Sequence, residues 1–198
     1  MTRWQTFYLD DPSLAAITSS ECARRAKELF TQYQNHLILD LGCGTGRDTS
    51  YLAGGISRVI GIDAAHSGLL LAQERFKLAC TQAALVEGDA HQLPFPAAIF
   101  DGIYCFGLLH EFATAAAADD VRQVMGEIHR ILRPDGLLIL TTLSGDPQQG
   151  LPHVRLFTEQ MFTEALEGFR VLEKREYADR GCTGKPNYRV WYGAFTRS

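Results

Sequence analysis

Three glycines and two aspartates have the types and the spacing needed to bind a nucleotide-like cofactor. A short apolar run ends in the segment Asp40-Leu41-Gly42-Cys43-Gly44-Thr45-Gly46, and a helix is expected to open after it. Glycine lets the chain turn sharply and lets a ligand approach the backbone without a Cβ in the way, and the helix start adds unpaired N–H groups. Asp63 lies 21 residues after Gly42, at the end of the next apolar run, where a carboxylate can accept hydrogen bonds from both ribose hydroxyls.

Two classes of cofactor use a glycine-rich turn of this kind. A dinucleotide fold requires Gly-x-Gly-x-x-Gly and places the pyrophosphate at the helix start. Here the spacing is Gly-x-Gly-x-Gly, and Arg47 stands where the third dinucleotide glycine should be. An acid such as Asp63 serves NAD and S-adenosylmethionine alike, so it does not separate the two classes. The glycine spacing therefore disfavours a nucleotide-binding oxidoreductase.

A second group of polar residues lies after the fourth apolar run. His110 and Glu111 follow it closely, at the sheet edge where open parallel sheets bind their substrates. His110 has the intrinsic pKa of a general base, but it could equally be a polar residue that begins a helix or closes a loop. His153, after the fifth run, is a further candidate. The other histidines are expected to be surface or capping residues.

The elements that must position these residues alternate between strands and helices. Strands are expected at 37–41, 58–62, 83–87, 99–106, 137–143, 169–177 and 188–196, and helices after a capping box at Thr18–Glu21 and at about 67–78, 121–132 and 158–167. Such alternation indicates a parallel sheet covered on both faces. The last two strands leave no room for a crossover helix, so they should pair antiparallel.

Four successive motifs resemble those of the class I S-adenosylmethionine-dependent methyltransferases, namely LDLGCGTGRDT, VIGIDAA, VEGDAHQLPFPAAIFDGIYC and EIHRILRPDGLLIL. The resemblance implies an α/β fold, a Rossmann-like, doubly wound, seven-stranded sheet that is mostly parallel with one antiparallel strand near the C-terminus. It implies the strand order 3-2-1-4-5-7-6. It also implies a single methyltransferase domain over residues 1–198, in which residues 1–36 form an N-terminal lid and helix segment.

The same resemblance implies which residues contact S-adenosylmethionine. Gly42, Gly44 and Gly46 would line the methionine part, Asp40 would hold its ammonium, and Asp63 would hold the ribose. The remaining implied contacts are Ala64 beside the ribose, Asp89 and Ala90 at the adenine, and Cys105 and Phe106 near the methionine part and the acceptor.

Three of the residues around this turn also have a structural interpretation. Cys43, between two glycines, is expected to be a small packing residue rather than a nucleophile. Asp40 could merely cap the turn, and Asp89 could be a solvated turn residue. The sequence leaves both aspartates with two possible roles.

The acceptor side is less specified than the cofactor side. Trp4, Phe7 and Tyr8 could form a lid that excludes water, or a clasp for the first helix. We take Tyr8, His110, Glu111 and His153 as candidate substrate contacts and His110 as the candidate catalytic residue. The nucleobase-methylating motif Asn/Asp-Pro-Pro-Tyr is absent, and so is any basic run, which favours a small-molecule acceptor and no nucleic acid.

Composition and charge agree with this interpretation. The net charge is −4, and the five cysteines form no Cys-x-x-Cys pair, so neither a metal site nor a disulfide framework is expected. No signal peptide or membrane-spanning stretch is visible, which favours a cytoplasmic protein without a membrane partner. We therefore expect a small-molecule methyltransferase that works by in-line transfer. The alternatives are a non-catalytic S-adenosylmethionine-binding or partner protein and, less favoured, an NAD-dependent oxidoreductase.

Overall fold

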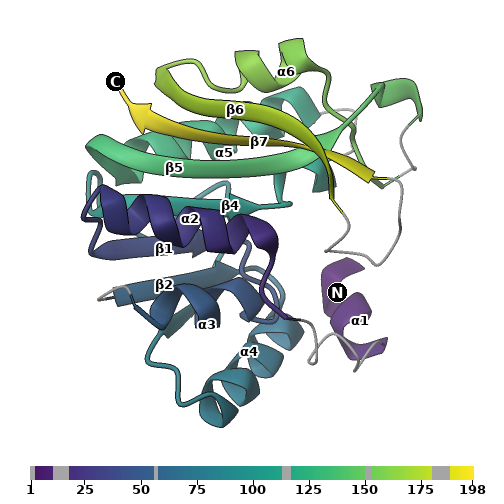
Figure 1. The fold of residues 1–198 in the computed structure, drawn as a ribbon. Coiled ribbons are helices and arrows are strands. Elements are labelled where there is room, and N and C mark those ends of the chain that lie inside the picture. Colours follow the sequence, from purple (N-terminus) through teal and green to yellow (C-terminus); the bar gives the residue numbers. More distant parts are fainter. Residues whose placement is uncertain (1–2, 11–17, 56–57, 113–116, 150–152, 180–187) are drawn as a thin grey trace.

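A computed structural model of the chain describes residues 3–10, 18–55, 58–112, 117–149, 153–179 and 188–198. Seven strands form one sheet in the order β3-β2-β1-β4-β5-β7-β6 (Figure 1). They are β1 (Leu37–Leu41), β2 (Arg58–Asp63), β3 (Ala84–Glu87), β4 (Phe100–Phe106), β5 (Leu132–Ser144), β6 (Phe169–Asp179) and β7 (Tyr188–Arg197). The pairs from β3 to β5 are parallel, and β7 pairs antiparallel with both β5 and β6. The expected fold class, strand order and single antiparallel strand are confirmed.

Helices cover both faces of this sheet. They are α1 (Arg3–Asp10), α2 (Glu21–Gln32), α3 (Arg47–Ala53), α4 (His66–Leu78), α5 (Ala117–Ile131) and α6 (Glu159–Glu164), with 3-10 turns η2 (Leu109–Glu111) and η3 (Pro147–Gln149). Helices α2 and α3 lie on one face and α5 and α6 on the other (Figure 1). Because neighbouring strand residues point to opposite faces, Ile38 packs under α2 while Leu39 packs in the core beneath α5.

Helix α5 confirms the helix that the clearest amphipathic pattern in the sequence predicted. Its apolar positions recur at helical spacing and are buried against the sheet, at Val121, Val124, Met125, Ile128 and Ile131. The helix ends at Ile131, and β5 begins at once with Leu132, which pairs with Phe100. The expected strand start at residue 137 is therefore wrong. The next pair joins Gly102 to Leu137, so the stretch with Pro134 and Gly136 forms an irregularity inside the strand rather than a loop.

Two features near the N-terminus also differ from expectation. The capping box was placed on Thr18, but Ser20 is the N-cap of α2 and its hydroxyl accepts from the Ala23 amide. The aromatic segment with Trp4, Phe7 and Tyr8 is itself a helix, α1, which no sequence pattern had indicated. Residues 180–187, expected from the sequence to connect the last two strands and containing Cys182, lie outside the described residues. Within those residues no helix combines the length and hydropathy needed to span a membrane, and no His/Cys/Asp/Glu cluster could hold a metal ion.

Candidate active site

The candidate site lies at the carboxyl edge of the sheet, between β1 and β4. The strand order reverses there, because β2 and β3 extend to one side of β1 while β4 and β5 extend to the other. Open α/β sheets bind their ligands in the crevice at such a switch point. The glycine turn follows β1 at this place, and Asp63 ends the neighbouring β2. The topology therefore brings the two sequence signals together.

Each of the three glycines has a left-handed φ, between 51° and 76°. A Cβ on Gly46 would lie 2.8 Å from both Ala72 Cβ and Phe76 Cε1, so this glycine is required by the packing of α4 behind the turn. Gly44 faces the other way, and its Cβ would lie 2.5 Å from the Tyr8 hydroxyl. Tyr8 thus covers the backbone of Gly44, which is buried in this structure, and a ligand reaches this backbone only if Tyr8 moves.

Asp63 holds the glycine turn in place. Its Oδ2 accepts from the Gly44 amide and its Oδ1 from the Ala65 amide, both at 2.8 Å. Burial raises the pKa of this carboxyl above its ordinary value, although the backbone bonds act in the opposite direction. Each oxygen has a further lone pair, so the carboxylate can still accept from hydroxyl groups.

Asp40 is a second buried carboxyl beneath the turn, and it is only 3% exposed. The Thr49 hydroxyl, from the first turn of α3, donates to its Oδ2 at 2.6 Å. Burial raises the pKa of Asp40 to about 7. A cation placed beside this carboxyl would favour its ionised form and lower that pKa.

A polar cluster that sequence reasoning missed joins α2, α3 and β4 next to the turn. The Asp48 carboxylate accepts from the Ser20 amide (2.8 Å), the Ser20 hydroxyl (2.9 Å) and the Tyr104 hydroxyl (3.0 Å). It also accepts from Arg47 Nη2 (3.0 Å), and the Arg47 guanidinium lies 5.3 Å from the centre of the Phe106 ring. The cluster fixes Arg47 at the end of β4. In the sequence, the cluster is indicated only by the charged pair Arg47 and Asp48 at the start of the helix after the glycines.

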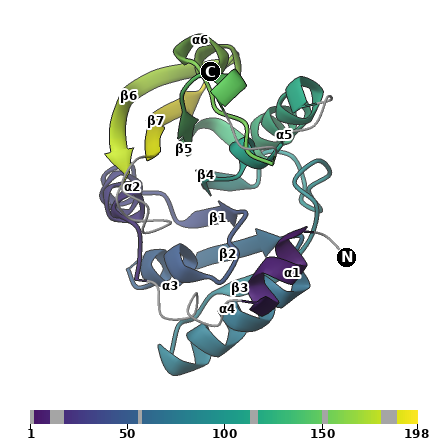
Figure 2. The same ribbon diagram turned by 90° about the vertical axis from the view of Figure 1, so that its right-hand side faces the viewer.

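Helix α1 lies across this edge, beside α4 (Figure 2). Tyr8 packs against Gly44 and Gly68. A Cβ added to Gly68 would lie within 3.0 Å of two atoms of the Tyr8 ring. The Ser67 hydroxyl donates to the Gln5 carbonyl at 2.9 Å. At the other end, Arg3 Nη1 donates to Glu111 Oε2 (3.1 Å) and to the His153 carbonyl (3.2 Å). The helix is therefore tethered on both sides of the glycine turn.

The η2 turn places His110 and Glu111 under the Arg3 end of α1. His110 Nε2 lies 3.4 Å from Glu111 Oε1, and Nδ1 has no hydrogen-bond partner among the residues that the structure describes. Burial, with a smaller effect of the Arg3 charge, lowers the pKa of His110 to about 4. Burial raises that of Glu111 to about 7 despite Arg3. His153 joins this group through its backbone only, and its side chain is exposed.

Three further candidates, Ala64, Asp89 and Ala90, follow the carboxyl ends of β2 and β3. Asp89 Oδ1 accepts from the His91 amide (2.9 Å) and lies 2.7 Å from His91 Nδ1, which lowers the pKa of Asp89. Asp89 thus fills the turn role that the sequence left open, and its side chain is 67% exposed, so Oδ2 remains accessible. Ala64 is exposed beside Asp63, and Ala90 is half-buried.

The two cysteines of the motifs are both buried. Cys105 is fully buried in the core beneath α5, and its thiol pKa is raised by burial. Only Phe106, the next residue, is half-buried at the strand end. Cys43 is buried, and its sulfur would lie 2.9 Å from a Cβ on Gly61 in β2. A packing role was expected for Cys43, and its neighbour in the structure is β2.

Comparison with known proteins gives a consistent result. The family model described as "Methyltransferase domain" matches residues 39–140. The chain is 30% identical over 194 residues to O-methyltransferase resE from Aspergillus sclerotiorum, covering 87% of this chain and 70% of that protein. It is 32% identical over 146 residues to O-methyltransferase cnsE from Penicillium expansum, covering 70% of this chain and 50% of that protein. The chain thus spans about half the length of cnsE, and 46% of another curated relative.

The fold also has a close counterpart among solved structures. An S-adenosylmethionine-dependent methyltransferase from Clostridium acetobutylicum superposes with a TM-score of 0.73 over 98% of both chains, at 15% sequence identity. At that identity the likeness concerns the fold.

Proposed function

The chain belongs to the class I S-adenosylmethionine-dependent methyltransferases, and from that premise we propose that it transfers the methyl group of S-adenosylmethionine to a small-molecule acceptor. One observation carries the proposal. The Asp63 carboxylate holds the Gly44 amide at the switch point of the sheet, and it keeps free lone pairs beside a backbone that has no Cβ.

The residues at the switch point fit S-adenosylmethionine chemically. Asp63, with Ala64 beside it, would hold the ribose hydroxyls, and the Asp40 carboxyl would hold the ammonium. The Arg47 guanidinium, fixed by Asp48, supplies a cation for the carboxylate of the methionine part. Gly42 and Gly44 would line that part, and Asp89 and Ala90 would meet the adenine. Gly46 would line the methionine part as well, and its packing against α4 supports the turn from behind.

The bound cofactor supplies a methyl group that is already activated on a sulfonium, so the protein's main tasks are positioning and exclusion of water. Helix α1 suits the second task, because Tyr8 covers Gly44 and Arg3 ties the helix to η2. Tyr8 occupies space directly against the turn, so α1 must shift when the cofactor enters.

His110 and Glu111 suit an acceptor that loses a proton. With the proton of the neutral imidazole on Nε2, facing Glu111 Oε1, the free Nδ1 can accept a hydrogen bond and then the proton of a hydroxyl acceptor. The low pKa keeps the imidazole neutral at physiological pH, but it also makes His110 a weak base, so it would take the proton only as the acceptor oxygen becomes positively charged during methyl transfer. Two relatives named O-methyltransferases support oxygen as the methylated atom.

A binding and turnover experiment tests the proposal. Calorimetry with S-adenosylhomocysteine and with NAD should show saturable binding of the first alone, and labelled S-adenosylmethionine should then transfer its methyl group within a panel of phenolic and carboxylic acceptors. Tighter binding of NAD would contradict the proposal. Binding of S-adenosylhomocysteine without transfer to any acceptor would favour the non-catalytic alternative.

A further inference from the structure

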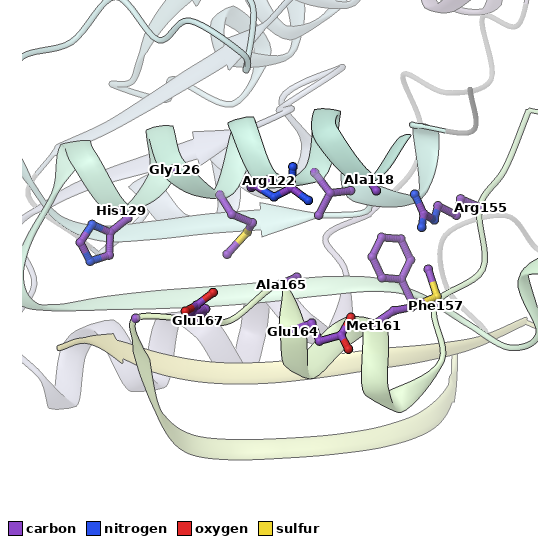
Figure 3. Close-up of a pocket in the computed structure, with 13 residues that line it drawn as sticks. Ala118, Arg122, Gly126, His129, Arg155, Phe157, Met161, Glu164, Ala165 and Glu167 are labelled. Carbon is purple, nitrogen blue, oxygen red and sulfur yellow. The ribbon is translucent and has the colours of Figure 1, made fainter. Parts of the chain in front are cut away.

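A groove between α5 and α6 lies on the face of the sheet away from α2 and α3, and it is separate from the glycine turn (Figure 3). Its volume of about 560 Å³ falls within the range of roughly 300–1,000 Å³ that is usual for small-molecule sites. Apolar side chains line its centre, at Val121, Met125, Phe157, Met161 and Ala165. These include both methionines other than Met1, and methionine adapts its shape to varied apolar ligands.

Gly126, in the middle of α5, is a second observation that points to a ligand in this groove. A glycine inside a helix costs about 1 kcal/mol relative to alanine. Packing does not explain it, because an added Cβ would meet no atom within 4 Å. Gly126 lines the groove, so any larger side chain there would extend into open space at the groove wall. The glycine thus keeps space open at a cost in helix stability.

The charges around the groove are arranged asymmetrically. Arg155 lies at one end with its guanidinium 5.7 Å from the centre of the Phe157 ring, and no carboxylate of the described residues pairs with it. Its backbone is fixed, since its amide donates to the His110 carbonyl at 2.7 Å. The other cation, Arg122, is paired with Asp119 at 2.6 Å. Glu167 lies at the opposite end, beside His129 (Figure 3). A second carboxylate, Glu164, lines the α6 side of the groove and accepts from Gln160 Nε2 at 2.8 Å.

We propose that this groove binds a free fatty-acid-like ligand, with its carboxylate at Arg155 and its apolar chain along α5. The Arg155 guanidinium, which has no carboxylate partner in the described part of the chain, attracts an anion at one end, and Glu167 repels it at the other, which fixes the orientation. From Ala118 to His129 the groove follows about 16 Å of helix, at 1.5 Å per residue, so an extended chain fits better than a compact ring. No residue of the glycine turn lines the groove, although its Arg155 end is joined to the η2 turn through the His110 carbonyl.

Fluorescence titration with cis-parinaric acid tests the groove itself. The unmodified protein should bind this fluorescent fatty acid saturably. Gly126→Leu fills the groove and should weaken binding tenfold or more, while Gly126→Ala, the matched control, should bind as the unmodified protein does. Both variants should fold, because each replaces a helical glycine by a better helix former. Circular dichroism and thermal unfolding check this.

The carboxylate end is tested with the methyl ester of the same probe. Arg155→Gln should weaken binding of the acid roughly tenfold, as expected for the loss of a charged hydrogen bond, and should leave binding of the ester unchanged. Arg58→Gln, an exposed arginine at the start of β2, should change neither. Unchanged affinity in folded Gly126→Leu, or equal effects of Arg155→Gln on acid and ester, would overturn the proposal.

Discussion

At the scale of single residues, the candidate site depends on polar groups that can still accept hydrogen bonds after their protein contacts are made. Asp63 and Asp40 are each held by protein donors and still have acceptor capacity. His110 is buried with one ring nitrogen unpartnered among the described residues, which costs free energy unless a ligand completes its bonding.

Asp63→Ala should weaken binding of S-adenosylhomocysteine tenfold or more. Hydrogen bonds to a charged group contribute roughly 1.5–3 kcal/mol each, and two ribose hydroxyls would lose their acceptor. Isothermal titration calorimetry measures the change. Asp89→Asn, which keeps an accepting oxygen, is the control and should lose little. An unchanged dissociation constant in folded Asp63→Ala would remove Asp63 from the cofactor site.

His110→Gln should lower the rate of methyl transfer at least tenfold and leave the affinity for S-adenosylhomocysteine nearly unchanged. The substitution removes the ring nitrogen that accepts the proton, and no cofactor contact is assigned to it. Steady-state rates with a hydroxyl acceptor, together with calorimetry, provide both readouts. Equal losses in turnover and cofactor affinity would argue that His110 has only a structural role.

At the scale of secondary structure, the site is a meeting point of strand ends closed by one helix. Strands β1, β2 and β4 deliver the glycine turn, Asp63 and Phe106 to the same edge, because parallel strands end together. Helix α1 spans that edge, with Tyr8 on the turn and Arg3 on η2. Opening and closing of the site therefore depend on how firmly α1 is tethered.

The Arg3 tether of α1 should weaken as the pH falls through about 7. The Glu111 carboxyl has its pKa raised to about 7, so protonation removes the negative partner of Arg3 near neutral pH, while Arg3 stays charged and His110 stays neutral. Trp4, in α1, should report this as a change in fluorescence between pH 8 and pH 6 in a Trp191→Phe background. Glu111→Gln should abolish the transition. A transition that persists in Glu111→Gln would assign it to another group, such as Asp40.

At the scale of the whole molecule, one sheet carries two candidate binding sites. The switch point between β1 and β4 lies at the carboxyl edge, whereas the groove of α5 and α6 lies on one face. The two packed cores on either side of the sheet join both to the same folded unit. Ligand binding at the switch point should thus stabilise the whole fold.

S-adenosylhomocysteine should raise the midpoint of thermal unfolding, and NAD should not. At a ligand concentration 100 times Kd the stabilisation is about 2.7 kcal/mol, which corresponds to roughly 5–10 °C for a protein of this size. Differential scanning fluorimetry at several ligand concentrations checks the logarithmic dependence. A shift of similar size with NAD at equal concentration would contradict the cofactor assignment.

The sequence by itself determined the sheet, the glycine turn and the acid at the end of β2. These features are local: apolar periodicity sets each strand and helix, and the spacing from Gly42 to Asp63 reflects one strand-helix-strand unit. The tertiary structure alone decided which residues surround the turn. Tyr8 meets Gly44, Arg3 meets Glu111, and Ser20 meets Asp48 across 28 to 108 positions of chain. Such pairs depend on how elements pack, and no local pattern encodes them. For the same reason the sequence did not show that the close approach of α4 also requires a glycine at position 46.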